Sequence, residues 1–267
     1  MSQRLLLVDR GNSGLKWLFL AAQEAPRRGR DMAELPAIAA TEEGVTPALI
    51  ASVADEQANG DLVAELTARG FAPWLATSPA ALGALRNSYE QPERMGVDRW
   101  LAMVAARHRH AGRLCVVDAG SALTIDFVDS EGRHEGGFII PGAALMRRAL
   151  FQDTDRVRFD ASVDAELAPG CSTAEAVNNG LLLAQAGAVR LALATAEAGG
   201  DTPRVFFCGG GAASLERAMD CTVARVPDLV FEGLVLQATE QKVIDGSWTS
   251  CLTESGFIAP ARTPPDA

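Results

Sequence analysis

Two pairs of apolar segments share one design, in which a short run ends in aspartate, passes a glycine turn and then resumes. The first pair is residues 4–9 (RLLLVD) and 15–22 (LKWLFLAA), and the second is residues 114–118 (LCVVD) and 122–128 (ALTIDFV). Apolar runs of this length, bounded by glycine and small polar residues, are typical of β-strands. The pattern therefore predicts two β-hairpins.

The two predicted hairpins indicate an internal duplication. Their aspartates, Asp9 and Asp118, stand 109 residues apart in a chain of 267 residues, which is long enough for two domains. We expect an α/β fold made of two similar domains. The N-terminal domain is expected over residues 1–113, the C-terminal domain over residues 114–247, and a C-terminal tail over residues 248–267.

The rest of the pattern predicts helices and short strands around the hairpins. Capping residues such as Thr46 (followed by Pro47 as the first helical residue), Asp98 and Ser172 precede or open stretches with apolar residues at helical spacing. The expected helices are residues 46–59, 61–69, 98–111, 143–151, 173–198 and 212–219. Short strands are expected at residues 71–76 and 205–208.

The glycine turns are the first candidates for chemistry. A strand that ends in aspartate before a glycine turn, as in residues 9–13 (DRGNS), can hold phosphate oxygens with backbone N–H groups while the carboxylate orients Mg²⁺. Such turns also close ordinary hairpins. Because residues 118–124 (DAGSALT) repeat the design, we expect two loops of one type to hold a triphosphate across a cleft. The glycines of residues 136–142 and 207–212 either let the backbone approach a ligand or only connect strand to helix.

A further candidate is the segment Gly96-Val97-Asp98-Arg99, which follows Tyr89, the one tyrosine of the chain. An aspartate at a helix start often serves only as an N-cap. In the functional interpretation, Asp98 accepts the proton of a substrate hydroxyl during phosphoryl transfer. Arg99 then offers paired donors to a carboxylate or phosphate.

The charge balance narrows the expected partners. The chain has 24 Lys and Arg against 34 Asp and Glu, for a net charge of −10. Nucleic acid or an anionic membrane surface requires clustered positive charge, so we expect neither as a partner. No signal peptide and no stretch of about 18 apolar residues is visible, which favours a cytoplasmic location.

The spacing of the cysteines, histidines and lysines argues against a structural metal site, disulfides and a P-loop. The five cysteines and three histidines have no zinc-site spacing and form no CxxC pair, so we expect neither a structural metal nor disulfides. Lys16 and Lys242 are the two lysines, and neither follows glycine as the P-loop requires. If the protein uses ATP, it does so without a P-loop.

Four motifs occur in a characteristic order. They are Asp-x-Gly-Asn-Ser from Asp9, Tyr-x-x-Pro-x-x-x-Gly-x-Asp-Arg from Tyr89, Asp-x-Gly-Ser-Ala-x-Thr from Asp118 and Gly-Gly-x-Ile-x-Pro-Gly from Gly136. In this arrangement the sequence resembles the type III pantothenate kinases, a family that includes the Bvg accessory factors, over residues 5–233. The resemblance implies two ribonuclease H-like domains of the actin, acetate kinase and sugar kinase type, with a cleft between them. It also implies a homodimer that phosphorylates pantothenate with ATP and Mg²⁺, the first step of coenzyme A synthesis.

The resemblance further implies roles for individual residues. ATP would be bound by Asp9, Arg10, Gly11, Asn12, Ser13, Gly14, Leu15, Lys16 and Ser121. Pantothenate would be bound by Tyr89, Gly96, Val97, Asp98, Arg99 and Thr173, the last from the same chain or from the dimer partner. Asp98 would accept the proton, and Asp118 would bind a monovalent cation, K⁺ or NH₄⁺, or else Mg²⁺ through water. Lys16 would either stabilise phosphate charge or only solvate the hairpin.

Two other functions stay open on the sequence. One is another small-molecule kinase of the same superfamily, acting on a sugar or a short carboxylic acid, although residues 89–99 favour pantothenate. The other is a non-catalytic regulatory protein that binds a nucleotide or a transcription partner. The joint presence of Asp9, Asp98 and Asp118 argues against this second function, because a binding module needs no base beside its substrate loop.

Overall fold

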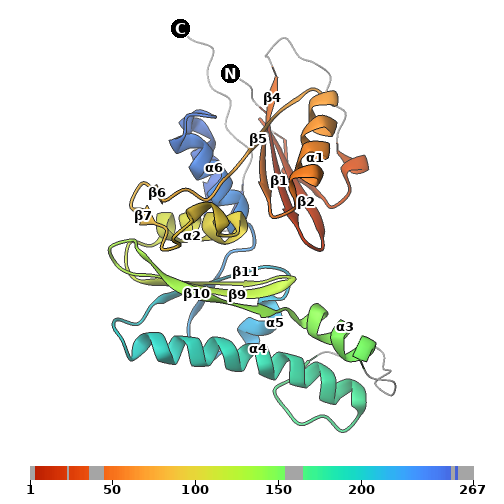
Figure 1. Ribbon diagram of the computed structural model, residues 1–267, viewed down its shortest axis with the longest axis vertical. Helices are drawn as coiled ribbons and strands as arrows, with labels where there is room; N and C mark the ends of the chain where they lie inside the picture. Colours follow the sequence, from red (N-terminus) through yellow and green to blue (C-terminus); the bar gives the residue numbers. More distant parts are fainter. Residues whose placement is uncertain (1–3, 23, 36–44, 154–164, 254–255, 258–267) are drawn as a thin grey trace. The chain divides into compact units, whose positions relative to one another are not determined.

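The computed structural model describes residues 4–22, 24–35, 45–153, 165–253 and 256–257. The chain divides into two compact units, the first formed by residues 1–105 with 228–267 and the second by residues 106–227. In the first unit the elements are β1 (Arg4–Gly11), β2 (Gly14–Ala21), β3 (Arg27–Gly29), η1 (Met32–Glu34), β4 (Thr46–Ser52), α1 (Glu56–Ala68), β5 (Phe71–Leu75), β6 (Ala81–Leu82), β7 (Leu85–Arg86), η2 (Pro92–Arg94), α2 (Val97–Arg109, which continues into the second unit), α6 (Leu229–Glu240), η3 (Gly246–Cys251), β13 (Leu252–Thr253) and β14 (Gly256–Phe257) (Figure 1). In the second unit they are β8 (Leu114–Ala119), β9 (Ala122–Val128), β10 (His134–Pro141), α3 (Ala143–Asp153), α4 (Thr173–Glu197), β11 (Arg204–Cys208), α5 (Ala212–Arg217) and β12 (Val223–Arg225).

The first unit is built on a five-stranded sheet of order β3-β2-β1-β4-β5. Strands β1 and β2 form the predicted hairpin, while β4 and β5 continue the sheet parallel to β1. Helix α1 covers one face, where Leu62 and Leu66 join Leu6 and Val8 in one apolar core (Figure 1). The central strand β1 is buried on both faces, because four consecutive residues, 5–8, have no exposed surface.

The second unit repeats this arrangement strand for strand. Its sheet has the order β10-β9-β8-β11-β12, with β8 and β9 as the hairpin and with β11 and β12 parallel to β8. The long helix α4 packs Leu182 and Val189 into the core formed with Val117, Ile125 and Phe207. The expected duplication of an α/β unit is therefore present, and each copy opens on a hairpin whose central strand carries an aspartate near its end.

One predicted helix is wrong. Residues 46–59 were expected to be helical from a cap at Thr46, but residues 46–52 form strand β4 and the helix begins only at Glu56. The four residues 48–51 have at most 1% of their surface exposed, because they lie between β1 and β5. Burial on both faces favours a central strand over a surface helix, and tertiary packing here overrides local propensity.

The boundaries of the two units differ from those expected. Residues 228–247 were assigned to the C-terminal half, yet α6 packs against β1 and β4 of the first unit. The expected tail over residues 248–267 begins inside η3, where Trp248 and Cys251 are buried. Residues 258–267 lie outside the described residues. Within the described part of the chain, no helix is both long enough and apolar enough to cross a membrane.

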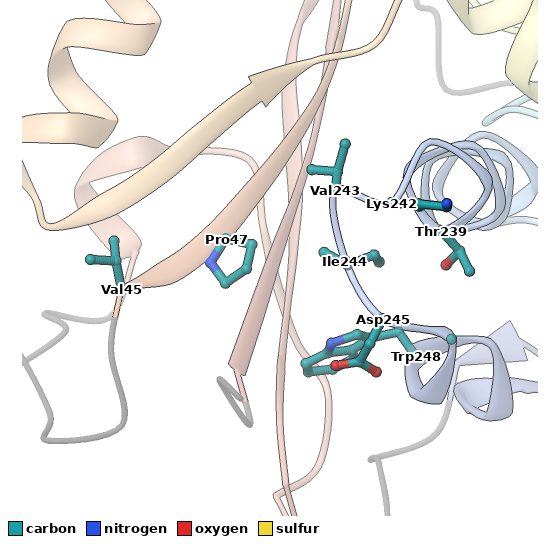
Figure 2. Close-up of a pocket in the computed structure, with 9 residues that line it drawn as sticks. Val45, Pro47, Thr239, Lys242, Val243, Ile244, Asp245 and Trp248 are labelled. Carbon is teal, nitrogen blue, oxygen red and sulfur yellow. The ribbon is translucent and has the colours of Figure 1, made fainter.

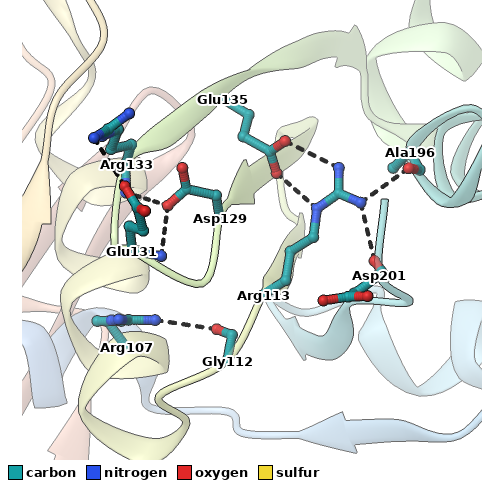
Figure 3. Close-up of polar contacts among 9 residues, drawn as sticks. All are labelled: Arg107, Gly112, Arg113, Asp129, Glu131, Arg133, Glu135, Ala196 and Asp201. Atoms are coloured by element: carbon teal, nitrogen blue, oxygen red, sulfur yellow. Dashed lines mark hydrogen bonds and ion pairs between the residues drawn. The ribbon is translucent and has the colours of Figure 1, made fainter. Parts of the chain in front are cut away.

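Arg113 is the polar anchor of the second unit (Figure 3). Its guanidinium donates two parallel hydrogen bonds of 2.9 and 3.0 Å to the carboxylate of Glu135 in β10. It also donates to the carbonyl oxygens of Ala196, in the last turn of α4, and of Asp201, each at 2.9 Å. One side chain therefore ties the sheet to the end of α4 and supplies a carbonyl of that helix with a donor.

We expect Arg113→Lys to lower the free energy of unfolding by about 1–3 kcal/mol, because an ammonium cannot reproduce the forked bond and the carbonyl contacts together. Urea unfolding followed by circular dichroism measures this. Arg133→Lys is the matched control, since Arg133 pairs with Glu131 at 2.8 Å but both side chains are about two-thirds exposed. Such surface pairs contribute little. Equal losses in the two variants would contradict the anchoring role of Arg113.

Candidate active site

The β1–β2 hairpin presents the first candidate turn. Gly11 pairs with Gly14, so the connection consists of Asn12 and Ser13 alone, both exposed. Gly14 has φ +145°, a conformation open to glycine and costly for other residues. The short turn exposes backbone N–H groups at its tip, as a phosphate-binding loop requires.

Side chains at the base of this turn are already engaged. Asp9 lies opposite Lys16 across the hairpin, and the Lys16 ammonium is 3.6 Å from an Asp9 carboxylate oxygen. Arg10 was expected to contact ATP, but its guanidinium donates to the carbonyl of Ala58 in α1 at 2.7 Å. This bond fixes the hairpin to α1. Lys16 is then the cation of the turn whose side chain is half exposed.

Asp9 is electrostatically coupled to Asp98. Burial raises the pKa of Asp9 most, Lys16 opposes this shift, and the nearby Asp98 carboxylate raises the pKa of Asp9 further. The structure thus brings together two of the aspartates that the sequence singled out. Two carboxylates that repel each other in a partly buried site are suited to share a divalent cation.

Asp98 occupies the first turn of α2, where its Oδ1 accepts the backbone N–H of Arg99 at 2.8 Å. The same oxygen lies 2.7 Å from the point where a Cβ on Gly96 would stand. A side chain at position 96 would therefore displace the carboxylate. Glycine at position 96 therefore lets the Asp98 carboxylate keep this position.

Tyr89 and Arg99 form the polar wall beside Asp98. Arg99 is only 6% exposed, and its guanidinium donates to the Tyr89 hydroxyl at 2.8 Å while lying 5.8 Å from the centre of the tyrosine ring. A guanidinium held in this way is of the kind that binds an anionic group of a small molecule with paired hydrogen bonds. The structure brings Tyr89 and residues 96–99 together, as predicted.

The sequence did not single out the contacts that hold α2 in place. Gln237 of α6 has no exposed surface, accepts from the Trp100 indole at 3.0 Å and donates to the carbonyl of Thr77 at 2.9 Å. Gly233, one turn earlier, lies so close to the backbone of Leu101 that an added Cβ would be 2.1 Å from its carbonyl oxygen. The signal in the sequence that could have revealed these contacts is a glutamine within an otherwise apolar helix. These contacts fix the helix that carries Asp98 and Arg99.

The β8–β9 turn of the second unit is enclosed by glycines. Asp118 is the last residue but one of β8, and its Oδ1 lies 2.2 Å from the point where a Cβ on Gly209 would stand, at φ +85°. The N–H of Gly142 donates to the carbonyl of Ser121 at 3.0 Å, and a Cβ on Gly142 would stand 2.4 Å from the carbonyl oxygen of Gly120. The two glycine segments expected at residues 136–142 and 207–212 therefore meet the Asp118 turn, and the result is a carboxylate among backbone carbonyl oxygens.

Thr173 lies elsewhere in the second unit. It is the exposed first residue of α4, directly after Ser172, whose hydroxyl accepts the N–H of Glu175 at 3.2 Å. Glu175 in turn accepts from the N–H of Cys171 at 2.7 Å. The expected capping pattern is present, and it holds the Thr173 hydroxyl at an exposed helix start.

Comparisons with known proteins identify relatives over most of the chain. Residues 5–194 match the type III pantothenate kinase family. A type III pantothenate kinase of Thiobacillus denitrificans is 38% identical over 238 residues, covering 88% of this chain and 96% of that protein. Another, from Ectopseudomonas mendocina, is 37% identical over 242 residues, covering 87% and 98%.

Two solved structures share the fold. One, described as a Baf family transcriptional activator of Campylobacter jejuni, has a TM-score of 0.57 at 23% identity and covers 90% of this chain and all of its own. The other, described as a 2-dehydro-3-deoxygalactonokinase of Sinorhizobium meliloti, has a TM-score of 0.54 at 17% identity with the same coverage. At such identities the likeness concerns the fold alone, and it confirms the expected sugar kinase type of α/β fold.

We expect Asp9→Asn to raise the stability of the metal-free protein at pH 7 while abolishing kinase activity. The folded-state pKa of Asp9 is raised, so its charge opposes folding above that pKa. This opposition fades as the pH falls towards the ordinary aspartate pKa, and the advantage of the asparagine variant should fade with it. Thermal unfolding between pH 4 and 8 measures the difference.

The control for this prediction is Asp61→Asn on the exposed face of α1, where Asp61 accepts a hydrogen bond from Gln57. We expect little change in stability or activity. An asparagine at position 9 that lowers stability at pH 7, or that keeps full activity, would contradict the coupling described above.

Proposed function

Because the chain belongs to the type III pantothenate kinase family, we propose that it transfers the γ-phosphoryl group of ATP to the primary hydroxyl of pantothenate, yielding 4′-phosphopantothenate and ADP. The observation that carries this proposal is the grouping of Asp9, Asp98, Arg99 and Tyr89 at one end of the first unit. This reaction is the first step of coenzyme A synthesis.

We propose that Asp98 accepts the proton of the pantothenate hydroxyl as that oxygen attacks phosphorus in line with the leaving ADP. The surroundings of Asp98 support this role, because Asp98 is coupled electrostatically to Asp9 and its Oδ1 is held by the backbone N–H of Arg99. A positioned base of this kind contributes about 10²–10⁴-fold to rate. Positioning and charge stabilisation supply the remainder.

Arg99 and Tyr89 are proposed to bind the carboxylate or amide oxygens of pantothenate. Support comes from the burial of Arg99 and from the Tyr89 hydroxyl that orients one of its N–H groups. Gly96 and Val97 would contribute backbone to the same wall, since glycine keeps the approach to Asp98 open. Thr173 is proposed as a further pantothenate contact.

The phosphates of ATP are proposed to bind to the turn of residues 9–16 and to Ser121. The exposed two-residue turn and the half-exposed ammonium of Lys16, which pairs with Asp9, support this assignment. Mg²⁺, bound with ATP, would neutralise charge on the phosphates. The raised pKa of Asp9 fits a carboxylate that holds such a cation or its water.

We propose that Asp118 binds a monovalent cation, K⁺ or NH₄⁺. The donor set supports this, because a single carboxylate lies among the carbonyl oxygens of the glycine-lined turn. Among the described residues no group of three or more His, Cys, Asp or Glu side chains is suited to hold a metal ion, which disfavours a dedicated divalent site. Equal activity in potassium, ammonium and sodium salts would contradict this assignment.

A homodimer is proposed through the outer face of α4. This face is made of small and apolar residues at helical spacing: Ala176, Gly180, Leu183, Gly187, Leu191 and Ala194, all exposed. Leu183 and Leu191 are 63% and 70% exposed. An added Cβ at Gly180 or Gly187 would meet only open space, so no contact with the described residues requires these helix-weakening glycines. Two such faces can approach closely and bury the leucines. We place the dimer in the cytoplasm.

We expect Asp98→Asn to lower kcat at least about 100-fold and to leave ATP binding nearly unchanged, because only the proton acceptor is lost. The asparagine keeps an oxygen for the Arg99 N–H, so the helix start is preserved. Steady-state kinetics and calorimetric ATP titration measure the two effects.

Asp55→Asn is the matched control, since Asp55 also opens a helix and accepts the N–H of Ala58 at 2.8 Å. It should keep full activity. In a strain that lacks pantothenate kinase, the wild type should restore growth and Asp98→Asn should not. Restoration by both would support the regulatory alternative, and ADP release from a panel of sugars and acids would reveal another substrate.

We expect Leu183→Asp to convert the dimer to a monomer, measured by light scattering after gel filtration, because a charge would then be buried against its own copy. Ala64→Asp on the exposed face of α1 is the control and should leave the mass unchanged. A wild-type monomer, or a dimer that survives Leu183→Asp, would contradict this interface.

A further inference from the structure

A cavity of about 520 Å³ lies in the first unit, between the start of β4, the end of α6 and η3 (Figure 2). Its size falls in the range of small-molecule sites. Pro47, Val243 and Ile244 form apolar walls, and Lys242, Asp245 and Trp248 supply polar groups. None of these residues belongs to the proposed kinase site.

Lys242 is held in an unusual backbone conformation at this cavity. Its φ is +60°, and among described residues other than glycine no further positive φ occurs. The N–H of Lys242 donates to the carbonyl of Thr239 at 3.0 Å and that of Val243 to the carbonyl of Ala238 at 2.8 Å, which is the Schellman ending of a helix. Glycine is the usual residue at this position, since it adopts positive φ without strain. A lysine kept here against backbone preference points to a use for its side chain.

Among the polar groups around the cavity, hydrogen-bond donors outnumber acceptors. Trp248 is only 4% exposed, yet its indole N–H has no hydrogen-bond acceptor in the described part of the chain. By contrast, the indoles of Trp17 and Trp100 donate to Asp31 and Gln237. The Trp248 indole nitrogen is not among the fully buried polar atoms of the described residues, so its N–H keeps accessible surface and is available to a ligand.

A further donor adjoins the same space, because the Lys242 ammonium forms no ion pair with the described residues. The acceptor at the cavity is Asp245, whose Oδ1 accepts from both the N–H and the hydroxyl of Ser247. A ligand that satisfies this lining therefore brings acceptor atoms, and its body is apolar.

We propose that this cavity is a binding site for a small carboxylate or sulfonate with an apolar body. The anionic head contacts the Lys242 ammonium and the Trp248 indole, and the body packs against Pro47, Val243 and Ile244. The proposal does not depend on the kinase assignment, because it rests on residues outside that site. It gives the protein a second place at which a metabolite of this class is recognised.

The test uses hexanoate as the probe and hexylamine as a probe with the same body and the opposite head. The four tryptophans of the chain give four indole N–H signals in a ¹⁵N-labelled sample, and Trp248→Phe identifies the one concerned. We expect hexanoate to shift the Trp248 signal saturably at millimolar concentration and to leave the other three unchanged. Hexylamine should leave all four unchanged.

Lys242→Gly separates binding from folding. Glycine suits the positive φ, so we expect this variant to unfold at a higher temperature than the wild type while it binds hexanoate about tenfold more weakly or not at all. Hexanoate binding that is unchanged in Lys242→Gly would overturn the proposal. So would an equal response to hexylamine, or the absence of any shift at Trp248. The readout is independent of kinase activity, so a failure of the proposed function does not affect it.

Discussion

In both units, the central strand of the sheet is buried on both faces and carries an aspartate close to its end, just before a tight turn. Val8 and Val117 have no exposed surface, and Asp9 and Asp118 follow them directly. A carboxylate that emerges from such a strand is incompletely hydrated, so a cation or a well-placed donor can take the place of water. The glycines around each turn are then required to let backbone groups reach the same point.

In the first unit, the charges of the candidate site oppose the stability of the fold. Asp9 and Asp98 repel each other, and the folded chain offsets this only in part through Lys16. Arg99 is held by Tyr89, and the helix that carries it is fixed by Gln237. The packing of α6 on α2 thus supports a group of charges that would separate if the helix were free to move.

The hairpins, the duplication and most helices follow from local pattern, because strand runs bounded by glycine and capped helical runs carry their own signals. Residues 46–52 do not, since an apolar run of this length suits helix or strand until its neighbours are known. The membership of α6 in the first unit was equally hidden, because an apolar helix does not specify which sheet it covers. For the site, motif order identified Tyr89 and residues 96–99, whereas Gln237 acts only through contacts distant in sequence. The engagement of Arg10 with Ala58 could not be predicted either, as it depends on where α1 lies.

The scarcity of lysine has a practical consequence for the chemistry of this protein. Lys16 stands at the hairpin turn with about half its side chain exposed, and Lys242 stands at the cavity beside α6. Apart from any terminal amine, these are the chain's only aliphatic amines. Acylating reagents, whether added in the laboratory or produced by metabolism as reactive thioesters, therefore have two lysine side chains to modify, in different surroundings. The extent of acylation of Lys16 reports on the occupancy of the turn, and that of Lys242 reports on the occupancy of the cavity.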